Sequence, residues 1–191
     1  MKQLSKLIKD FLDDMGLRHE RSDDQKDFKI GFTGDNGHFS AMITVDNVGR
    51  RIVVDTMCPI NVPKTRLLAV TELTARINFG LALGNLDIDL GDGLILFRTG
   101  IKVGRINLDH ETLFALICGN LWMMDRYAPA IASVAYGDIT PQKAMAMLED
   151  EPGQAKEAQE ALSKQRRSRK QQSADGRTAP KKSRPTSPQS H

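Results

Sequence analysis

Apolar residues near the start of the chain follow a helical pattern. They recur at steps of three and one along residues 4–15, which predicts an amphipathic helix. Gly16 follows directly and suits a left-handed cap that ends the helix. A helix this short is marginal alone in water, so its apolar side is expected to pack on the rest of the fold. That side consists of Leu4, Leu7, Ile8, Phe11, Leu12 and Met15.

Between residues 28 and 57 apolar and polar positions alternate, which is typical of strands with one buried face. Two alternating runs flank Asn36-Gly37, a strong hairpin signal because both residues accept positive φ. A turn at 46–49 leads into a third run at 51–57. The pattern predicts a three-stranded antiparallel meander, preceded by a polar link over residues 18–27.

A second helix and a second hairpin are predicted next. Pro63 suits the first turn of the helix. Residues 86–90 then alternate strictly, Gly91-Asp92-Gly93 turns the chain, and residues 94–101 return it. The packing face expected for the helix is Leu67, Leu68, Val70, Leu73, Ile77 and Leu81.

The last ordered segments are predicted to be helical. Asn107 or Asp109 is placed to cap a third helix, and Pro129 is expected to kink or split it. Thr140-Pro141 begins a short fourth helix that runs to about residue 148. The element order α-βββ-α-ββ-α-α predicts an α+β fold, with helices packed on an antiparallel sheet of about five strands.

Composition divides the chain at residue 150. Residues 1–150 hold 17 Lys and Arg against 20 Asp and Glu, whereas residues 151–191 hold 10 against 4. From Ser168 onward the sequence holds no Val, Leu, Ile, Met, Phe, Tyr or Trp, so this segment buries too little surface to offset its ordering entropy. We therefore expect an α+β domain over 1–150 and a basic, disordered tail over 151–191.

Motifs for catalysis are absent from the sequence, which holds no GxGxxG, Walker, GxSxG or HExxH pattern. The four histidines do not lie at ligand spacing, and Asp87, Asp89 and Asp92 do not fit a calcium loop. The prediction is a non-enzyme with no cofactor and no metal site. The charged N-terminal segment does not fit a signal peptide, so a cytoplasmic location without a membrane span is expected.

The two cysteines, Cys58 and Cys118, lie sixty positions apart. Buried, reduced thiols are the favoured interpretation, and a disulfide between them stays open at this point. Methionines gather near the C-terminal helices, where they either fill the core or line a flexible binding groove. These are Met123, Met124, Met145 and Met147.

Two surfaces are candidates for binding. The run Leu94, Ile95, Leu96 and Phe97 is apolar on both faces of its strand, so one face is expected to meet a partner protein or a second subunit. The tail is the other candidate, since clustered cations contact polyanions without reading sequence; a merely solubilising tail is the alternative. The cations in question are Lys164, Arg166, Arg167, Arg169 and Lys170.

The chain resembles the YbjN-type family of bacterial sensory-transduction regulators. The resemblance is carried by residues 76–79 (RINF), 86–90 (LDIDL), 92–98 (DGLILFR), 124–131 (MDRYAPAI) and 135–137 (AYG). It implies a fold similar to type III secretion chaperones, often dimeric, that acts in regulation or protein binding without catalytic residues. The basic tail departs from the family pattern, which ends with the last helix.

The sequence thus favours a non-enzymatic protein-binding or regulatory module of the YbjN type. Its partner is a protein of unknown identity, and a homodimer is expected. Two alternatives stay open: a secretion-chaperone-like protein that holds a client segment, and a nucleic-acid-associated protein that acts through the basic tail.

Overall fold

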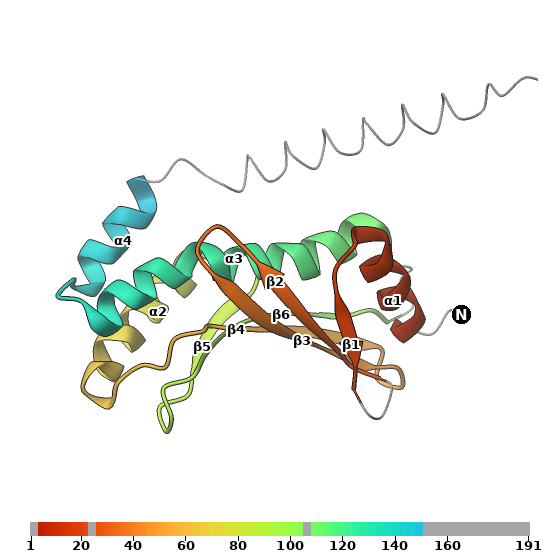
Figure 1. Cartoon of the computed structure of the whole chain (residues 1–191), viewed down its shortest axis with the longest axis horizontal. Coiled ribbons are helices and arrows are strands. Elements are labelled where there is room, and N and C mark those ends of the chain that lie inside the picture. Colours follow the sequence, from red (N-terminus) through yellow and green to blue (C-terminus); the bar gives the residue numbers. More distant parts are fainter. Residues whose placement is uncertain (1–3, 23–25, 105–107, 151–191) are drawn as a thin grey trace, which may run out of the picture. The chain divides into compact units, whose positions relative to one another are not determined.

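The computed structural model describes residues 4–22, 26–104 and 108–150 of the chain (Figure 1). Six strands form one sheet in the order β1-β2-β3-β4-β6-β5, and every neighbouring pair is antiparallel. The predicted α+β class with an antiparallel sheet is confirmed. The elements are α1 (Leu4–Met15), β1 (His19–Arg21), β2 (Phe28–Thr33), β3 (His38–Asp46), β4 (Arg51–Met57), a 3-10 turn (Lys64–Arg66), α2 (Leu67–Gly80), β5 (Asn85–Ile88), β6 (Ile95–Lys102), α3 (His110–Tyr136) and α4 (Pro141–Asp150).

The core lies between the sheet and the long helix α3. Figure 1 shows α1 and α3 on the same side of the sheet, with α2 and α4 beside the C-terminal part of α3. Alternate residues of the central strands point to the helices, and Ile43, Val54 and Ile95 are completely buried there. From α3, Ile117 and Met124 complete this layer with no exposed surface. The apolar positions of the alternating sequence pattern therefore face the core, and the positions between them face away from it.

Local signals near the helix ends are confirmed. Gly16 has φ +67° and ends α1, where the Leu17 N–H bonds the Leu12 carbonyl at 3.0 Å, a Schellman-type cap. Asp109 caps α3 by accepting the Thr112 N–H at 2.8 Å. Thr140 accepts the Lys143 N–H at 3.3 Å at the start of α4. Asn107, the other predicted cap of α3, lies outside the described residues.

The hairpin predicted at Asn36-Gly37 joins β2 and β3, and the Gly34 N–H bonds the Gly37 carbonyl at 2.9 Å. Its turn differs from the prediction, because neither Asn36 nor Gly37 has a positive φ. The connection is four residues long, so the chain reverses without the strained two-residue turn that needs positive φ.

Three sequence-based expectations are wrong in detail. The polar link contains a sixth strand, β1, which pairs Glu20 with Lys29 of β2. The helix α3 continues through Pro129, so of the two predicted outcomes, a kink or a split, the split is wrong. Leu68, expected on the packing face of α2, is 87% exposed, while Val70, Leu73 and Ile77 are buried.

The domain boundary at residue 150 stays a prediction. Residues 151–191, including the five tail cations Lys164, Arg166, Arg167, Arg169 and Lys170, lie outside the described residues.

Candidate functional site

The side of the sheet that points away from α1 and α3 is the candidate binding surface, and we call it the open face. Strand positions on this side alternate with the core positions, and none of the described ones in β2, β3, β4 and β6 is buried. Antiparallel sheets commonly leave one face to solvent, where polar residues are expected. The central residues of the open face are Lys29, Met42, Val53, Asp55, Met57, Leu96 and Arg98.

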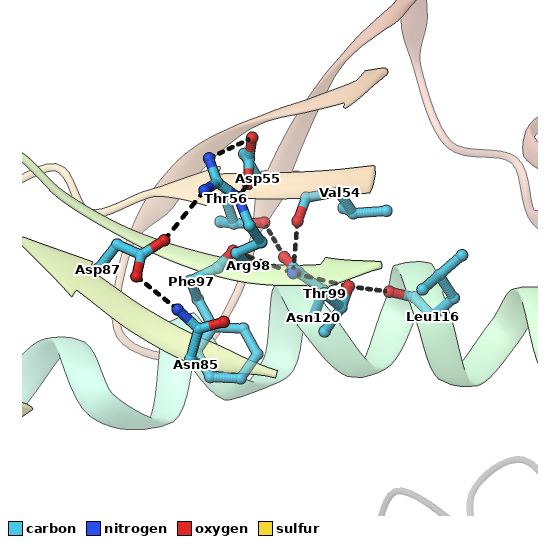
Figure 2. A network of polar contacts seen from close by, with 10 residues as sticks. All are labelled: Val54, Asp55, Thr56, Asn85, Asp87, Phe97, Arg98, Thr99, Leu116 and Asn120. Atoms are coloured by element: carbon cyan, nitrogen blue, oxygen red, sulfur yellow. Dashed lines mark hydrogen bonds and ion pairs between the residues drawn. The ribbon is translucent and has the colours of Figure 1, made fainter. Parts of the chain in front are cut away.

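Arg98 forms an ion-pair network across three strands of the open face (Figure 2). Its Nε and Nη2 donate to the two carboxylate oxygens of Asp55 at 2.7 and 3.2 Å, and its Nη1 lies 3.2 Å from Asp87 Oδ2. The hydrogen bonds to Asp55 raise the pKa of Arg98. Asn85 Nδ2 donates to Asp87 Oδ1 at 2.5 Å. The guanidinium is therefore held in one orientation over β4, β6 and β5.

Apolar side chains flank this network. Met57 and Leu96 are directly opposite each other on β4 and β6, and Met42 is opposite Asp55. Met57 is exposed, and Val53, Met42 and Leu96 are half-buried. This part of the open face thus combines a fixed charge network with apolar contact area.

The four residues of the predicted partner face divide between the two sides of β6. Ile95 and Phe97 have no exposed surface and belong to the core under α3, so no partner reaches them in this fold. Leu96 points to the open face and Leu94, directly before β6, is half-buried. One face of the strand packs on α3. On the other face, Leu96 lies between Met57 of β4 and Asp87 of β5.

A buried amide fixes the opposite side of the same strands. Asn120 of α3 donates from Nδ2 to the carbonyls of Val54 and Phe97 and to Thr99 Oγ1, each at 3.0 Å (Figure 2). Its Oδ1 accepts from Thr56 Oγ1 at 2.5 Å. Thr99 Oγ1 donates in turn to the Leu116 carbonyl at 2.8 Å. Sequence reasoning missed this role, although an isolated amide in an apolar helix is a signal that such a network exists.

A second buried polar residue, Asp125, holds the β2–β3 hairpin against α3. Its carboxylate accepts the N–H groups of Asp35 at 3.0 Å and Asn36 at 2.8 Å. A Cβ added to Gly34 would lie 2.4 Å from the Asp125 carboxylate, so a larger residue at position 34 would force that carboxylate to move. Asp125 is buried together with the neighbouring Tyr127, whereas Arg126 between them is half-buried.

The edge of the sheet at β5 is closed by α2. Asn78 Nδ2 donates to the Leu86 carbonyl at 2.9 Å, and Asn78 Oδ1 accepts the Leu86 N–H at 2.8 Å. The side-chain amide thereby takes the place of a neighbouring strand at this residue, which blocks strand addition there.

Cys58 and Cys118 are free thiols in the core, so no disulfide joins them. Burial raises the pKa of Cys58 to about 11 and that of Cys118 to about 12, which keeps both protonated and unreactive at neutral pH. Among the C-terminal methionines Met124 is completely buried and Met147 is exposed. Within the described residues, no three His, Cys, Asp or Glu side chains group as metal ligands would.

The described helices include none with both the length and the apolar character needed to cross a membrane.

Solved structures similar to this chain include YbjN from E. coli, described as "a putative transcription regulator", with 16% identity, a TM-score of 0.49, and coverage of 66% of this chain and 90% of that one. The ExsC-ExsE complex matches with 12% identity, a TM-score of 0.44, and coverage of 66% and 91%. The HopA1-SchA chaperone-effector complex matches with 20% identity, a TM-score of 0.44, and coverage of 68% and 98%.

No curated protein matches the sequence. The family model described as "Putative bacterial sensory transduction regulator" matches residues 5–133, a span that begins in α1 and ends within α3. The resemblance inferred from the sequence is confirmed, and this chain belongs to the YbjN family.

Proposed function

We propose that this chain is a non-enzymatic, protein-binding regulatory module whose open face receives the partner. The observation that carries the proposal is the composition of that face at β4 and β6. Met57 and Leu96 lie side by side there, next to an arginine that is already paired with Asp55 and Asp87.

This composition suits a protein partner for physical reasons. Methionine and arginine are enriched at protein interfaces, and unpaired charges are depleted from interface centres. Because Arg98 is held by two carboxylates, a partner meets an ordered surface and loses little side-chain entropy on binding. Leu94 and Leu96 are the members of the predicted partner face that remain in the proposal.

The closed edge at Leu86 favours contact with the face of the sheet over strand addition at β5. A homodimer and a cytoplasmic location are part of the same proposal.

The test is affinity capture from native extract, followed by direct binding of the purified partner. The full chain is compared with a Met57→Glu/Leu96→Lys variant, whose opposite charges face each other across β4 and β6, and with a Val48→Lys control. Lysine at position 96 faces Asp87 on β5, so the fold is expected to tolerate it. Val48 lies in the β3–β4 turn and is 97% exposed. A lysine at this position therefore adds a positive charge without altering the open face.

The expected result is one protein partner that binds the wild type and the Val48→Lys control equally and the open-face variant at least about tenfold more weakly. A chain that ends at Asp150 is expected to keep the partner. Binding that survives the open-face substitutions, that requires residues 151–191, or that disappears on nuclease treatment would contradict the proposal.

A further inference from the structure

Two basic side chains lie directly opposite each other at one end of the open face. Arg51 of β4 is in register with Lys102 of β6, and both side chains are exposed. The neighbouring residues Arg50 and Val103 share a ladder hydrogen bond of 2.8 Å, from the Val103 N–H to the Arg50 carbonyl. Residues 51 and 102 therefore form a non-hydrogen-bonded pair, in which the Cα atoms approach to about 4.5 Å. We call Arg51 and Lys102 the basic pair.

The charge of the basic pair is only weakly compensated. Asp46 lies opposite Arg51 on β3, but its Oδ1 accepts the N–H groups of Val48 at 3.1 Å and Gly49 at 2.8 Å. Its Oδ2 lies 3.9 Å from Arg51 Nη2, a distance at which an ion pair is weak. Among the residues that the structure describes, none forms an ion pair with Lys102. Since like charges directly opposite each other destabilise a sheet, this fold keeps a pair that favours an anionic group from outside.

The open face is low between the basic pair and Arg98, because Gly100 has no side chain there. Gly100 is exposed and lies opposite Val53 in an uninterrupted register, so it does not form a bulge. Its φ is not positive, and an added Cβ would meet only the Ile52 carbonyl oxygen at 3.4 Å and the Val53 side chain at 3.6 Å. The strand itself therefore does not require glycine. A glycine of this kind marks a place where another backbone approaches closely.

The apolar part of the open face lies at the other end of the same two strands. Met57 is six residues after Arg51 on β4, which corresponds to about 20 Å along a strand. Leu96 lies opposite Met57 on β6. Along β4 and β6 the open face thus offers apolar contact at one end, an accessible backbone in the middle and positive charge at the other end.

We propose that the partner protein docks on the open face with an extended segment that is apolar at one end and carries Asp or Glu about 20 Å away. The apolar side chains cover Met57 and Leu96, and the carboxylates lie between Arg51 and Lys102. The segment is extended because its backbone passes over Gly100, whereas the backbone of a helix is enclosed by its own side chains. This inference rests on the proposed function, since it names the kind of segment that the open face receives.

A nucleic acid fits this face less well than an acidic segment of a protein. Its phosphates carry negative charge along the whole backbone. The middle of the open face holds two carboxylates, Asp55 and Asp87, beside Arg98 (Figure 2). A phosphate backbone would bring like charges against them, whereas a segment that is acidic at one end meets only the basic pair.

The first test is a selection of random peptides, displayed on phage, on the immobilised full chain. A length of about 12 residues suffices, since an extended peptide of this length spans about 40 Å. The enriched peptides are expected to be apolar at one end and acidic at the other. The Arg51→Glu/Lys102→Glu variant keeps residues 151–191, so peptides held by the charge of that segment are recovered on both proteins. No enrichment, or the same acidic peptides enriched on both proteins, would overturn the proposal.

The second test measures the Kd of the most enriched peptide, made synthetically, for variants of the full chain. Lys102→Glu is expected to weaken binding about tenfold or more, because the introduced carboxylate repels the acidic end. Its urea unfolding midpoint is expected to be no lower than that of the wild type, since position 102 then faces Arg51 with the opposite charge. The matched control is Lys6→Glu, an equal change of charge at an exposed position of α1, which is expected to leave the Kd unchanged.

Gly100→Val tests the close approach of the peptide backbone. The variant is expected to bind the peptide about tenfold more weakly, because the valine side chain fills the low part of the open face. Its unfolding midpoint is expected to equal or exceed that of the wild type, since valine favours a strand more than glycine does. Unchanged binding by both Gly100→Val and Lys102→Glu would overturn the proposal.

The Met57→Glu/Leu96→Lys variant keeps this inference apart from the proposed function, because it removes the apolar end and leaves the basic pair in place. Peptide binding that is lost in this variant but unchanged in Lys102→Glu would retain the open face and refute the acidic segment. Binding that neither variant weakens would refute both proposals. Competition by a DNA duplex that also depends on Lys102 would assign the basic pair to a polyanion and overturn the inference.

Discussion

Asn36 Nδ2 donates a hydrogen bond to the backbone carbonyl of Asp125 at 3.1 Å. In an uninterrupted helix that carbonyl accepts the N–H of residue 129, but residue 129 is a proline and has none. The hairpin between β2 and β3 therefore supplies the donor that Pro129 lacks. This contact joins the hairpin to α3 and removes part of the cost of a proline inside the helix.

The first prediction is that Asn36 and Pro129 are energetically coupled. Asn36→Ala is expected to lower the free energy of unfolding by about 1 kcal/mol, since the Asp125 carbonyl loses its donor. In a Pro129→Ala background the loss is expected to be smaller, because the substituted alanine brings its own N–H. Urea unfolding of both single variants and the double variant measures the coupling. Equal losses in the two backgrounds would contradict this role of Asn36.

The second prediction concerns the buried amide of Asn120. Asn120→Ala is expected to cost about 3 kcal/mol of unfolding free energy, because Thr56 Oγ1 loses its acceptor and a cavity opens under β4 and β6. The control is Asn61→Ala at an exposed position, which is expected to change stability by less than about 0.5 kcal/mol. Similar effects at both positions would show that the network around Asn120 adds no stability.

The third prediction is that the Arg98–Asp55 pair orients the open face but stabilises the fold little. Both side chains are partly exposed, so a double-mutant cycle with Arg98→Ala and Asp55→Ala is expected to give a coupling below about 1 kcal/mol. The coupling should fall further as salt is added, because exposed charges are screened. A large coupling that persists at high salt would place this pair in a far less hydrated environment than the structure shows.

The fourth prediction follows from the two core thiols. Burial raises the pKa of Cys58 from 9.0 to about 11 and that of Cys118 from 9.0 to about 12. Above pH 9 the unfolded thiols ionise while the folded ones stay protonated, so stability is lost as the pH rises from 9 toward those values. Each thiol contributes a loss of about 1.4 kcal/mol per pH unit in this range.

Unfolding measurements between about pH 8 and pH 10 check this slope against the Cys58→Ala/Cys118→Ala variant, which should lose stability less steeply. Only the slopes are compared, since the substitutions also change packing at every pH. Identical slopes would show that the thiols are not buried in solution. Tyr127, whose pKa is also raised by burial, is present in both proteins and cancels in the comparison.

The sequence by itself determined the elements whose signals are local. The cap at Gly16, the start of α4 at Thr140 and the position of the hairpin at residues 34–37 depend on contacts between residues at most five positions apart. The hydrophobic alternation likewise predicted the strands from β2 onward, since core and outside alternate with the same period as the side chains. The family resemblance rests on the same spacing of apolar residues.

Tertiary structure alone decided which face of β6 is buried. The run from Leu94 to Phe97 is apolar at every position, so it has no alternation that would distinguish the buried face of the strand from the exposed one. The pairing of Phe97 with Thr56 and of Leu96 with Met57 turns Phe97 to α3 and Leu96 to the open face. Such pairing joins residues far apart in the chain, which no local pattern encodes.

The same physical reason explains the other differences. The strand β1 consists of three polar residues and forms because β2 offers unpaired backbone groups along its edge. The helix α3 passes through Pro129 with a donor from Asn36, which lies 89 positions before the accepting residue Asp125. Local sequence sets which conformation each segment prefers. Whether a buried backbone group finds a hydrogen-bond partner depends on residues distant in sequence, and those residues come together only when the chain has folded.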